Sequence, residues 1–382
     1  MCPDRILIGS CMISFQDILT WPCSHGSIMD RSTKLRRVEA LRRRLPHLSA
    51  SAFASILKEL HDDPIDPVDR NTVRKARNEV LHSTSAYGAI MQSLDLVGVD
   101  GQPIVINVAD PFAMLHHMVK NCPGFASLVK RTAEHSPCSY ETPWRLALYS
   151  DEVVPGNQLS FHNQRKIWVL YFSFLEFGPQ VLSQEDAWIC LSICKSDTVK
   201  AISGGMAQLF GRILEHMFSE RSHNFKEAGI WLDFPDEVSC PSFRLFCKLN
   251  MILQDGGAHK QVFLAKGDAG TKFCICCRTL YTEKSGILNG ETKDELLTCS
   301  HLLESEQDFA TDDDIRGTVS RLASFAANCS QEVLKAREQA CGFNHHPANM
   351  LLNRNLDDVV FPASQFAHDW MHTFLSTGFG IL

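Results

Sequence analysis

Apolar and polar positions alternate along the later part of this chain in a way that predicts secondary structure. Residues 145–150 and 167–174 are short apolar runs rich in aromatic and β-branched side chains, which is typical of buried strands. Residues 199–219 repeat apolar positions at helical spacing and predict one long amphipathic helix. Residues 230–234 indicate a further strand, and residues 243–253 a long apolar element. Strands that alternate with helices predict a mixed α/β core.

Residues 31–85 have a different, basic pattern. Leu35, Val38 and Leu41 stand at helical spacing among arginines, and two further short helices are expected before residue 85. Three short helices with a basic last one fit a helix-turn-helix-like DNA reader, and a solvated helical lead-in fits the same pattern equally well. The side chains that would contact DNA are Arg42, Arg43, Arg44, Arg74 and Lys75.

The other regions follow from the same pattern. Residues 1–30 show no clear period and form an irregular leader, and residues 86–140 form a connecting region. Within that region, residues 103–106 predict a strand and residues 110–120 predict a helix. Residues 141–382 hold the predicted α/β core, which makes them the main domain of the chain.

Composition narrows the class of protein. The chain has 382 residues, 45% of them hydrophobic, and a net charge of -7, so any surface for nucleic acid has to be local. Its 15 cysteines are an odd number without the spacing of a disulfide-stapled secreted domain, which favours a reducing compartment, the cytosol or nucleus. The N-terminus makes a poor signal peptide, and residues 167–177, the longest apolar-rich stretch, fall short of the roughly 18 residues that span a bilayer. We expect a soluble protein without a membrane partner.

Two acids stand where apolar strands are expected to end. Asp151 closes the first strand and is followed by a turn composition, where a carboxylate either binds a hard cation or simply forms the turn. Asp255 ends the apolar element, and Gly256 and Gly257 give the backbone freedom just after it. Asp268, in a glycine-rich turn, is the weaker candidate for a second catalytic acid.

A cysteine pair suggests a second metal-binding site, of a kind different from the acid pair. Cys274 and Cys277 have two residues between them and can grip one tetrahedral zinc from a tight turn, although buried apolar thiols would give the same pattern. They begin a predicted insertion over residues 274–340, of which 311–340 are helical. The missing ligands have two competing sources: Cys299 with His301, or His372 with His368. Asp369 and His372 would also be neighbours on one helix face.

Taken in order, these motifs resemble the catalytic region of eukaryotic DDE/D cut-and-paste transposases, particularly the CACTA-type and Plavaka-like group, more distantly related to the RAG recombinase core. The resemblance covers roughly residues 140–382 and rests on Asp151, on Asp255 with its cysteine pair, and on Asp369-x-x-His372. It implies an RNase H-like α/β core with acids on adjacent strand ends. It also implies DNA strand cleavage and transfer with two Mg²⁺ or Mn²⁺ ions on Asp151 and Asp255, and a structural Zn²⁺ on Cys274, Cys277 and His372.

The same resemblance implies a nuclear protein whose partners are transposon ends, with a homo-oligomer as a further option. In this family a third acid, a Glu on a helix, follows the Asp-x-x-His, and only two residues remain here after residues 378–380. We therefore treat the sequence as a C-terminally truncated copy and expect impaired cleavage. The alternatives are a non-catalytic, zinc-stabilised DNA- or protein-binding module that uses residues 31–82, and a decayed element fragment.

Overall fold

The fold is described from a computed structural model. It describes Leu57 and residues 82–154, 166–219, 222–234, 243–278, 280–281, 297–298 and 308–368. The side chains expected to contact DNA, at residues 42–44 and 74–75, and the leader at residues 1–30 lie outside the described residues. No helix in the described ranges is long and apolar enough to cross a membrane.

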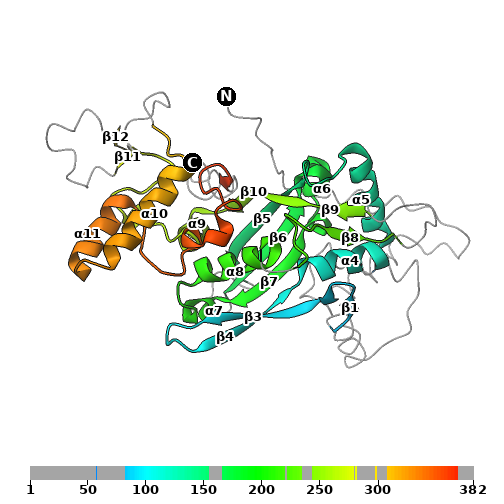
Figure 1. Cartoon of the computed structure of the whole chain (residues 1–382), viewed down its shortest axis with the longest axis horizontal. Helices are drawn as coiled ribbons and strands as arrows, with labels where there is room; N and C mark the ends of the chain where they lie inside the picture. The colour runs from blue at the N-terminus through cyan, green and yellow to red at the C-terminus, as the bar shows by residue number, and fades with distance from the viewer. Residues whose placement is uncertain are drawn as a thin grey trace, which may run out of the picture. The chain divides into compact units, whose positions relative to one another are not determined.

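A five-stranded mixed sheet organises the described residues from Ser83 onward (Figure 1). Its strands in spatial order are β13 (Phe366–His368), β10 (Cys247–Gln254), β5 (Trp144–Val153), β6 (Ile167–Phe174) and β7 (Ile189–Lys195). The strands β5, β6 and β7 form an antiparallel meander, whereas β10 runs parallel to β5 and β13 runs parallel to β10. Parallel neighbours need crossover connections, so helices follow β7 and β10 in the chain. The mixed α/β class expected from the sequence is confirmed.

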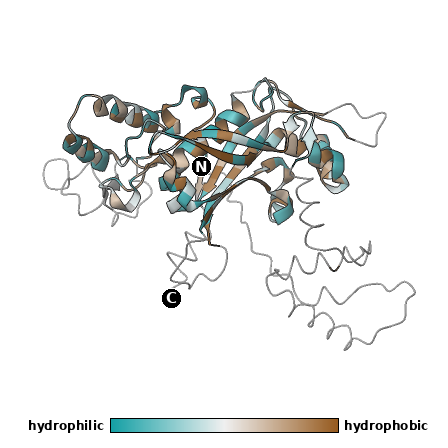
Figure 2. Ribbon diagram, turned by 90° about the horizontal axis from the view of Figure 1, so that it is seen from below, coloured by the Kyte–Doolittle hydropathy of each residue, from teal (hydrophilic) through white to brown (hydrophobic). Residues whose placement is uncertain are grey.

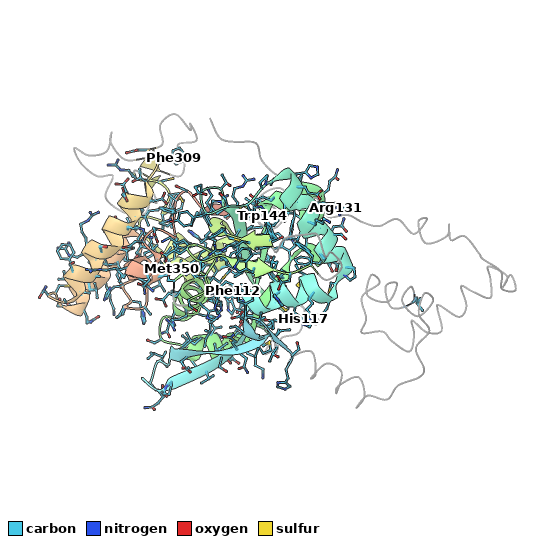
Figure 3. All side chains as sticks on the ribbon, turned by 45° about the vertical axis from the view of Figure 1, so that its right-hand side comes forward. Phe112, His117, Arg131, Trp144, Phe309 and Met350 are labelled. Carbon is cyan, nitrogen blue, oxygen red and sulfur yellow. The ribbon has the colours of Figure 1, made fainter. Side chains whose placement is uncertain are left out.

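The two central strands are apolar on both faces because both faces are covered. Trp144 and Leu148 of β5 are 1% exposed and Phe172 of β6 is fully buried. Aromatic and β-branched side chains suit such a pleated, covered surface. Figure 2 shows brown, hydrophobic ribbon along these strands, and Trp144 lies among densely packed side chains in Figure 3. Both strands predicted here are confirmed, but β5 continues beyond the predicted end at residue 150 to Val153, so the turn expected directly after Asp151 is wrong.

The helix predicted over residues 199–219 is wrong in one respect, because the chain forms two helices there. These are α7 (Ser196–Ala201) and α8 (Met206–Phe218). Gly204 and Gly205 separate them with φ angles of 79° and 55°, in the left-handed region that a continuing helix does not use. Most residues of α8 are buried, and its apolar side chains belong to the hydrophobic core, while Gln208, Arg212 and Glu215 follow one another at helical spacing on one side.

The described residues before the sheet share its hydrophobic core instead of merely connecting to it. Leu96, Val108 and Phe112 all belong to that core. Asp110 is the N-cap of the first helix, since its Oδ1 accepts the N–H groups of the second and third residues after it. The strand and the helix predicted in this region are confirmed. Its elements are β1 (Thr84–Ser85), β2 (Gly88–Ala89), the hairpin of β3 (Met91–Val97) with β4 (Pro103–Ala109), α4 (Pro111–Asn121) and α5 (Pro123–His135).

The long apolar element predicted over residues 243–253 is two strands. The first, β9 (Phe243–Leu245), pairs antiparallel with β8 (Ile230–Leu232), which confirms the strand predicted there. The second is β10, and Phe246 stands between them. The carbonyl of Phe246 accepts a hydrogen bond from the N–H of Trp144, so the chain changes partners from β8 to β5 at this residue. Apolarity alone does not show such a change of partner.

After β10 the chain forms α9 (Gly256–Phe263), a pair of two-residue strands, β11 (Leu280–Tyr281) and β12 (Leu297–Thr298), and two longer helices. These helices, α10 (Asp312–Ala326) and α11 (Gln331–Cys341), confirm the helical prediction and lie side by side at one end of the unit (Figure 1). The prediction did not place the break between them. Ser330 makes that break, because its Oγ accepts the N–H of Val333 as the N-cap of α11.

Candidate functional site

Asp151 lies in the last part of β5. Side chains alternate between the faces of a strand, so Asp151 lies on the same face as Tyr149 and opposite the fully buried Ser150. The Tyr149 hydroxyl donates a hydrogen bond of 3.1 Å to Oδ2 of Asp151. The carboxylate is only partly buried. It is therefore both oriented by a neighbour and open to solvent.

Asp255 is the first residue after β10 and the N-cap of α9. Its Oδ1 accepts the N–H of Ala258 at 2.5 Å. Gly256 and Gly257 open the helix and do not take a positive φ, so the freedom inferred for them is not used. Instead, a Cβ at Gly257 would lie 3.5 Å from both carboxylate oxygens of Asp255. The small residue leaves room beside the acid.

The register of two parallel strands brings these acids together. Tyr149 pairs with Leu253, and Ser150 pairs with Gln254, so Asp151 and Asp255 are the next residues on adjacent strands. Neighbouring strands lie about 4.8 Å apart, and in a parallel pair residues in register point to the same face. The two acids therefore occupy adjacent positions at the same end of the sheet, although they are far apart in the sequence.

A buried polar contact holds this register one residue before the acids. The Nε2 of Gln254 donates a hydrogen bond of 2.7 Å to the Oγ of Ser150, and both residues are 0% exposed. This bond lies on the face of the sheet opposite the acids. Its donor and acceptor match only when the two strands keep this alignment, because a slip by one residue would turn each side chain to the other face.

The third parallel strand ends at the same edge. His368 of β13 pairs with Gln254, which places the main chain of His368 level with the residue before Asp255. The side chain of His368 is not described, and Asp369 and His372 lie outside the described residues. Asp268 is in a turn at residues 267–269, beyond the far end of α9 from Asp255, and its side chain is likewise not described.

Glu152, which follows Asp151, has a structural task that the sequence did not reveal. Its carboxylate accepts hydrogen bonds from Ser196 Oγ at 2.6 Å and from Lys166 Nζ at 2.9 Å. Burial raises the pKa of this carboxyl, but the bonds from Ser196 and Lys166 outweigh burial and leave the pKa below its ordinary value. Glu152 is therefore an ionised anchor that joins β5 to Lys166, just before β6, and to Ser196, the first residue of α7. The partners are distant in sequence, so no local signal could have found them.

The cysteine turn holds three free thiols, those of Cys274, Cys276 and Cys277. The thiols of Cys276 and Cys277 donate to the sulfur of Cys274, which lowers the pKa of Cys274 and raises the pKa values of the other two. The turn is joined to the start of α10 by hydrogen bonds from Ala310 N–H to the Cys276 carbonyl and from Arg278 N–H to the Asp308 carbonyl. The zinc pair predicted from the two-residue spacing was Cys274 and Cys277, and Cys276 was not part of it.

These groups do not complete a metal site by themselves. Among the described residues, no group of three or more His, Cys, Asp or Glu side chains could hold a metal ion. The other zinc candidates, Cys299 and His301, lie outside the described residues. The structure thus brings together Asp151 with Asp255, and Cys274 with Cys277, as two separate pairs.

Comparison with known proteins identified no relative of this chain in two searches. Neither a scan against protein-family models nor a search of curated proteins found a match to the sequence. Any functional conclusion therefore rests on the two pairs and on the topology that positions them.

Proposed function

We propose that this chain is a transposase-derived protein of the DDE/D type, with an RNase H-like core and an ancestral activity of metal-dependent DNA strand cleavage and transfer. The observation that carries the proposal is the register that makes Asp151 and Asp255 neighbours on adjacent parallel strands. The sheet supports it further, since an antiparallel meander followed by two parallel strands supplies the mixed sheet and adjacent strand ends that such a core requires. DNA is then the partner, and the nucleus the place of action.

The donor set suits hard divalent cations. Carboxylate oxygens are the ligands that Mg²⁺ and Mn²⁺ prefer, and two such ions in a nuclease lie about 3.5–4 Å apart, close to the spacing of neighbouring strands. Because Oδ1 of Asp255 is bonded to the N–H of Ala258, its Oδ2 is the atom that would face a cation. Tyr149 orients the Asp151 carboxylate by donating to its Oδ2. Bound ions would activate the attacking hydroxyl and stabilise the leaving oxygen.

A nicking assay with matched variants tests this activity. Full-length protein is incubated with supercoiled plasmid in Mn²⁺, alongside Asp151→Asn, Asp255→Asn and the control Asp95→Asn, an exposed acid on β3. We expect Mn²⁺-dependent nicking that falls by about 100-fold or more in the first two variants, because each removes a ligand charge, and that persists in the control. Nicking that is absent, or that is equal in all four proteins, would reject the catalytic proposal.

The cysteine turn supports a structural zinc as a second part of the proposal. A thiolate at Cys274 beside Cys277 gives the soft ligands that Zn²⁺ prefers, and the turn brings them together without long-range help. Cys299, His301 and His372 are the candidates for the remaining ligands. The ion would supply folding energy to the insertion and would take no part in strand cleavage.

One observation favours a different function, that of a non-catalytic DNA-binding module. Asp255 already has a complete structural role as the N-cap of α9, which is reason enough for an acid there. In that case DNA binding would weaken with rising salt, survive Asp151→Ala and Asp255→Ala, and be lost when Arg42, Arg43 and Arg44 are replaced together by Gln. Binding that instead fails in the two Asp variants at low salt would count against the module.

A further inference from the structure

A cavity of about 200 Å³ is lined by residues of the cysteine turn and of α10, and neither Asp151 nor Asp255 is among its lining residues. Its inner walls include Ile315 and Phe343, which are 2% and 1% exposed. The buried Ile275 and Ala310 also line it, and its polar lining includes Lys272, Arg278 and Arg321. The cavity is thus lined by buried apolar residues together with three basic side chains.

The lining of this cavity holds three basic residues and one acid. Asp314 is the one acid in the lining, and its Oδ2 accepts the N–H of Thr311 at 3.0 Å and its hydroxyl at 2.9 Å, as part of the capping box of α10. Arg278 meets Asp308 at 3.4 Å, where both side chains are about half exposed and the pair is correspondingly weak. The lining therefore has a positive surplus.

A helical glycine accommodates one of the basic side chains. Gly317 lies inside α10, where glycine destabilises a helix relative to alanine. A Cβ at this position would lie 3.2 Å from Nη1 of Arg321, so the guanidinium occupies the space that the missing methyl group leaves. Its Nη2 donates to Thr318 Oγ1 at 3.2 Å, which directs the arginine back along the helix and toward the cavity.

We propose that this cavity binds a phosphate group, either in the backbone of a nucleic-acid strand or on a free phosphorylated compound. Two guanidinium forks and an ammonium group can donate to several oxygens of one tetrahedral anion, which a carboxylate does not offer. An anion of this size fits in about 200 Å³ with room for the group that carries it. The proposal does not depend on Asp151 or Asp255.

Calorimetric titration with inorganic phosphate tests the site directly. The full-length protein is compared with Arg321→Gln, Arg278→Gln and the control Lys335→Gln, an exposed lysine on the neighbouring helix α11. We expect each arginine variant to weaken phosphate binding by about ten-fold or more, because each removes charge-assisted hydrogen bonds, and the control to bind as the parent does. Absent binding, or equal binding in all four proteins, would overturn the proposal.

A second variant guards against misfolding as the cause of any loss. Gly317→Ala keeps every charge, improves helix propensity and crowds Arg321, so it should weaken phosphate binding without lowering the melting temperature. If Arg321→Gln does not fold, the phosphate affinity of Gly317→Ala becomes the deciding measurement. An affinity unchanged from the parent protein would count against the site.

Titration with a short single-stranded DNA that lacks terminal phosphates separates the two sources. If the strand is the source, phosphate competes with it and Arg321→Gln weakens its binding. If a free compound is the source, phosphate binds in an Arg321-dependent way while DNA binding is unchanged by that variant. Asp151→Asn should leave phosphate binding intact, so failure here and failure of strand cleavage are distinguishable.

Discussion

The sheet edge and the cysteine turn are both candidate metal regions, but they are held in place by different means. At the sheet edge, Asp151 and Asp255 are positioned by the register of β5 and β10, whose side chains Leu148 and Ile252 are 1% and 0% exposed. At the cysteine turn, the thiols of neighbouring residues interact by hydrogen bonding to Cys274, and main-chain hydrogen bonds tie the turn to the residues just before α10. The difference indicates that the acids stand on a frame that needs no ion, whereas the turn is of the kind that an ion stabilises.

The largest expected effect concerns zinc at the cysteine turn. Cys274→Ser should reduce the zinc content from about one ion per chain to none, because a thiolate ligand is lost, whereas Cys329→Ser, a half-buried cysteine outside the turn, should not. Metal analysis of the purified proteins measures this. Hydrogen exchange after chelation sharpens the comparison, since amides at residues 274–277 should lose protection while those of β5 keep it.

Zinc retained in Cys274→Ser, or absent from the parent protein, would remove the metal from this turn. Loss of protection that spreads equally to β5 would contradict the distinction between the two regions.

A smaller effect is expected when the buried contact beside the acids is removed. Ser150→Ala leaves the Nε2 of Gln254 buried without its acceptor and should lower the free energy of unfolding by about 1–3 kcal/mol. It should also weaken Mn²⁺ binding, since the register next to Asp151 and Asp255 is loosened. Denaturant unfolding and calorimetric Mn²⁺ titration give the two values.

Ser173→Ala is the matched control, because Ser173 is a fully buried β6 serine whose hydroxyl donates to the carbonyl of Ala187. It should cost similar stability without changing Mn²⁺ affinity. If both variants weaken Mn²⁺ binding equally, the effect is one of general stability and the register argument fails.

The smallest effect concerns the pH dependence of stability at Glu152. A lowered folded pKa means that this carboxylate stabilises the fold above its unfolded value of 4.5, and that this contribution is lost as the pH falls through the folded pKa. Glu152→Gln should therefore be less stable than the parent at pH 7, by about 0.5 kcal/mol, and the gap should close toward pH 3. Unfolding curves at both pH values measure it, with the exposed Glu134→Gln as control. If the difference in free energy of unfolding between the parent and Glu152→Gln is the same at both pH values, the charge of Glu152 does not contribute to stability.

Several elements were predictable because their causes are local. The strand at residues 167–174 and the helix that begins after Asp110 follow from side-chain periodicity and from a capping acid, and both are properties of a few consecutive residues. The break at Gly204 and the change of strand partner at Phe246 were missed. The first depends on backbone angles that glycine permits without requiring, and the second on a hydrogen bond to Trp144, which is distant in the sequence.

The candidate site divides in the same way. The sequence by itself determined that Asp151 and Asp255 each follow an apolar run, and that Cys274 and Cys277 share one turn, because spacing and apolarity are encoded locally. It did not show that β5 continues past Asp151 to Val153. Only the tertiary structure decided that β5 and β10 are parallel neighbours, that Ser150 pairs with Gln254, and hence that the two acids occupy adjacent positions. Main-chain hydrogen bonds between strands are the same for every residue type, so strand pairing is selected by the packing of the whole core.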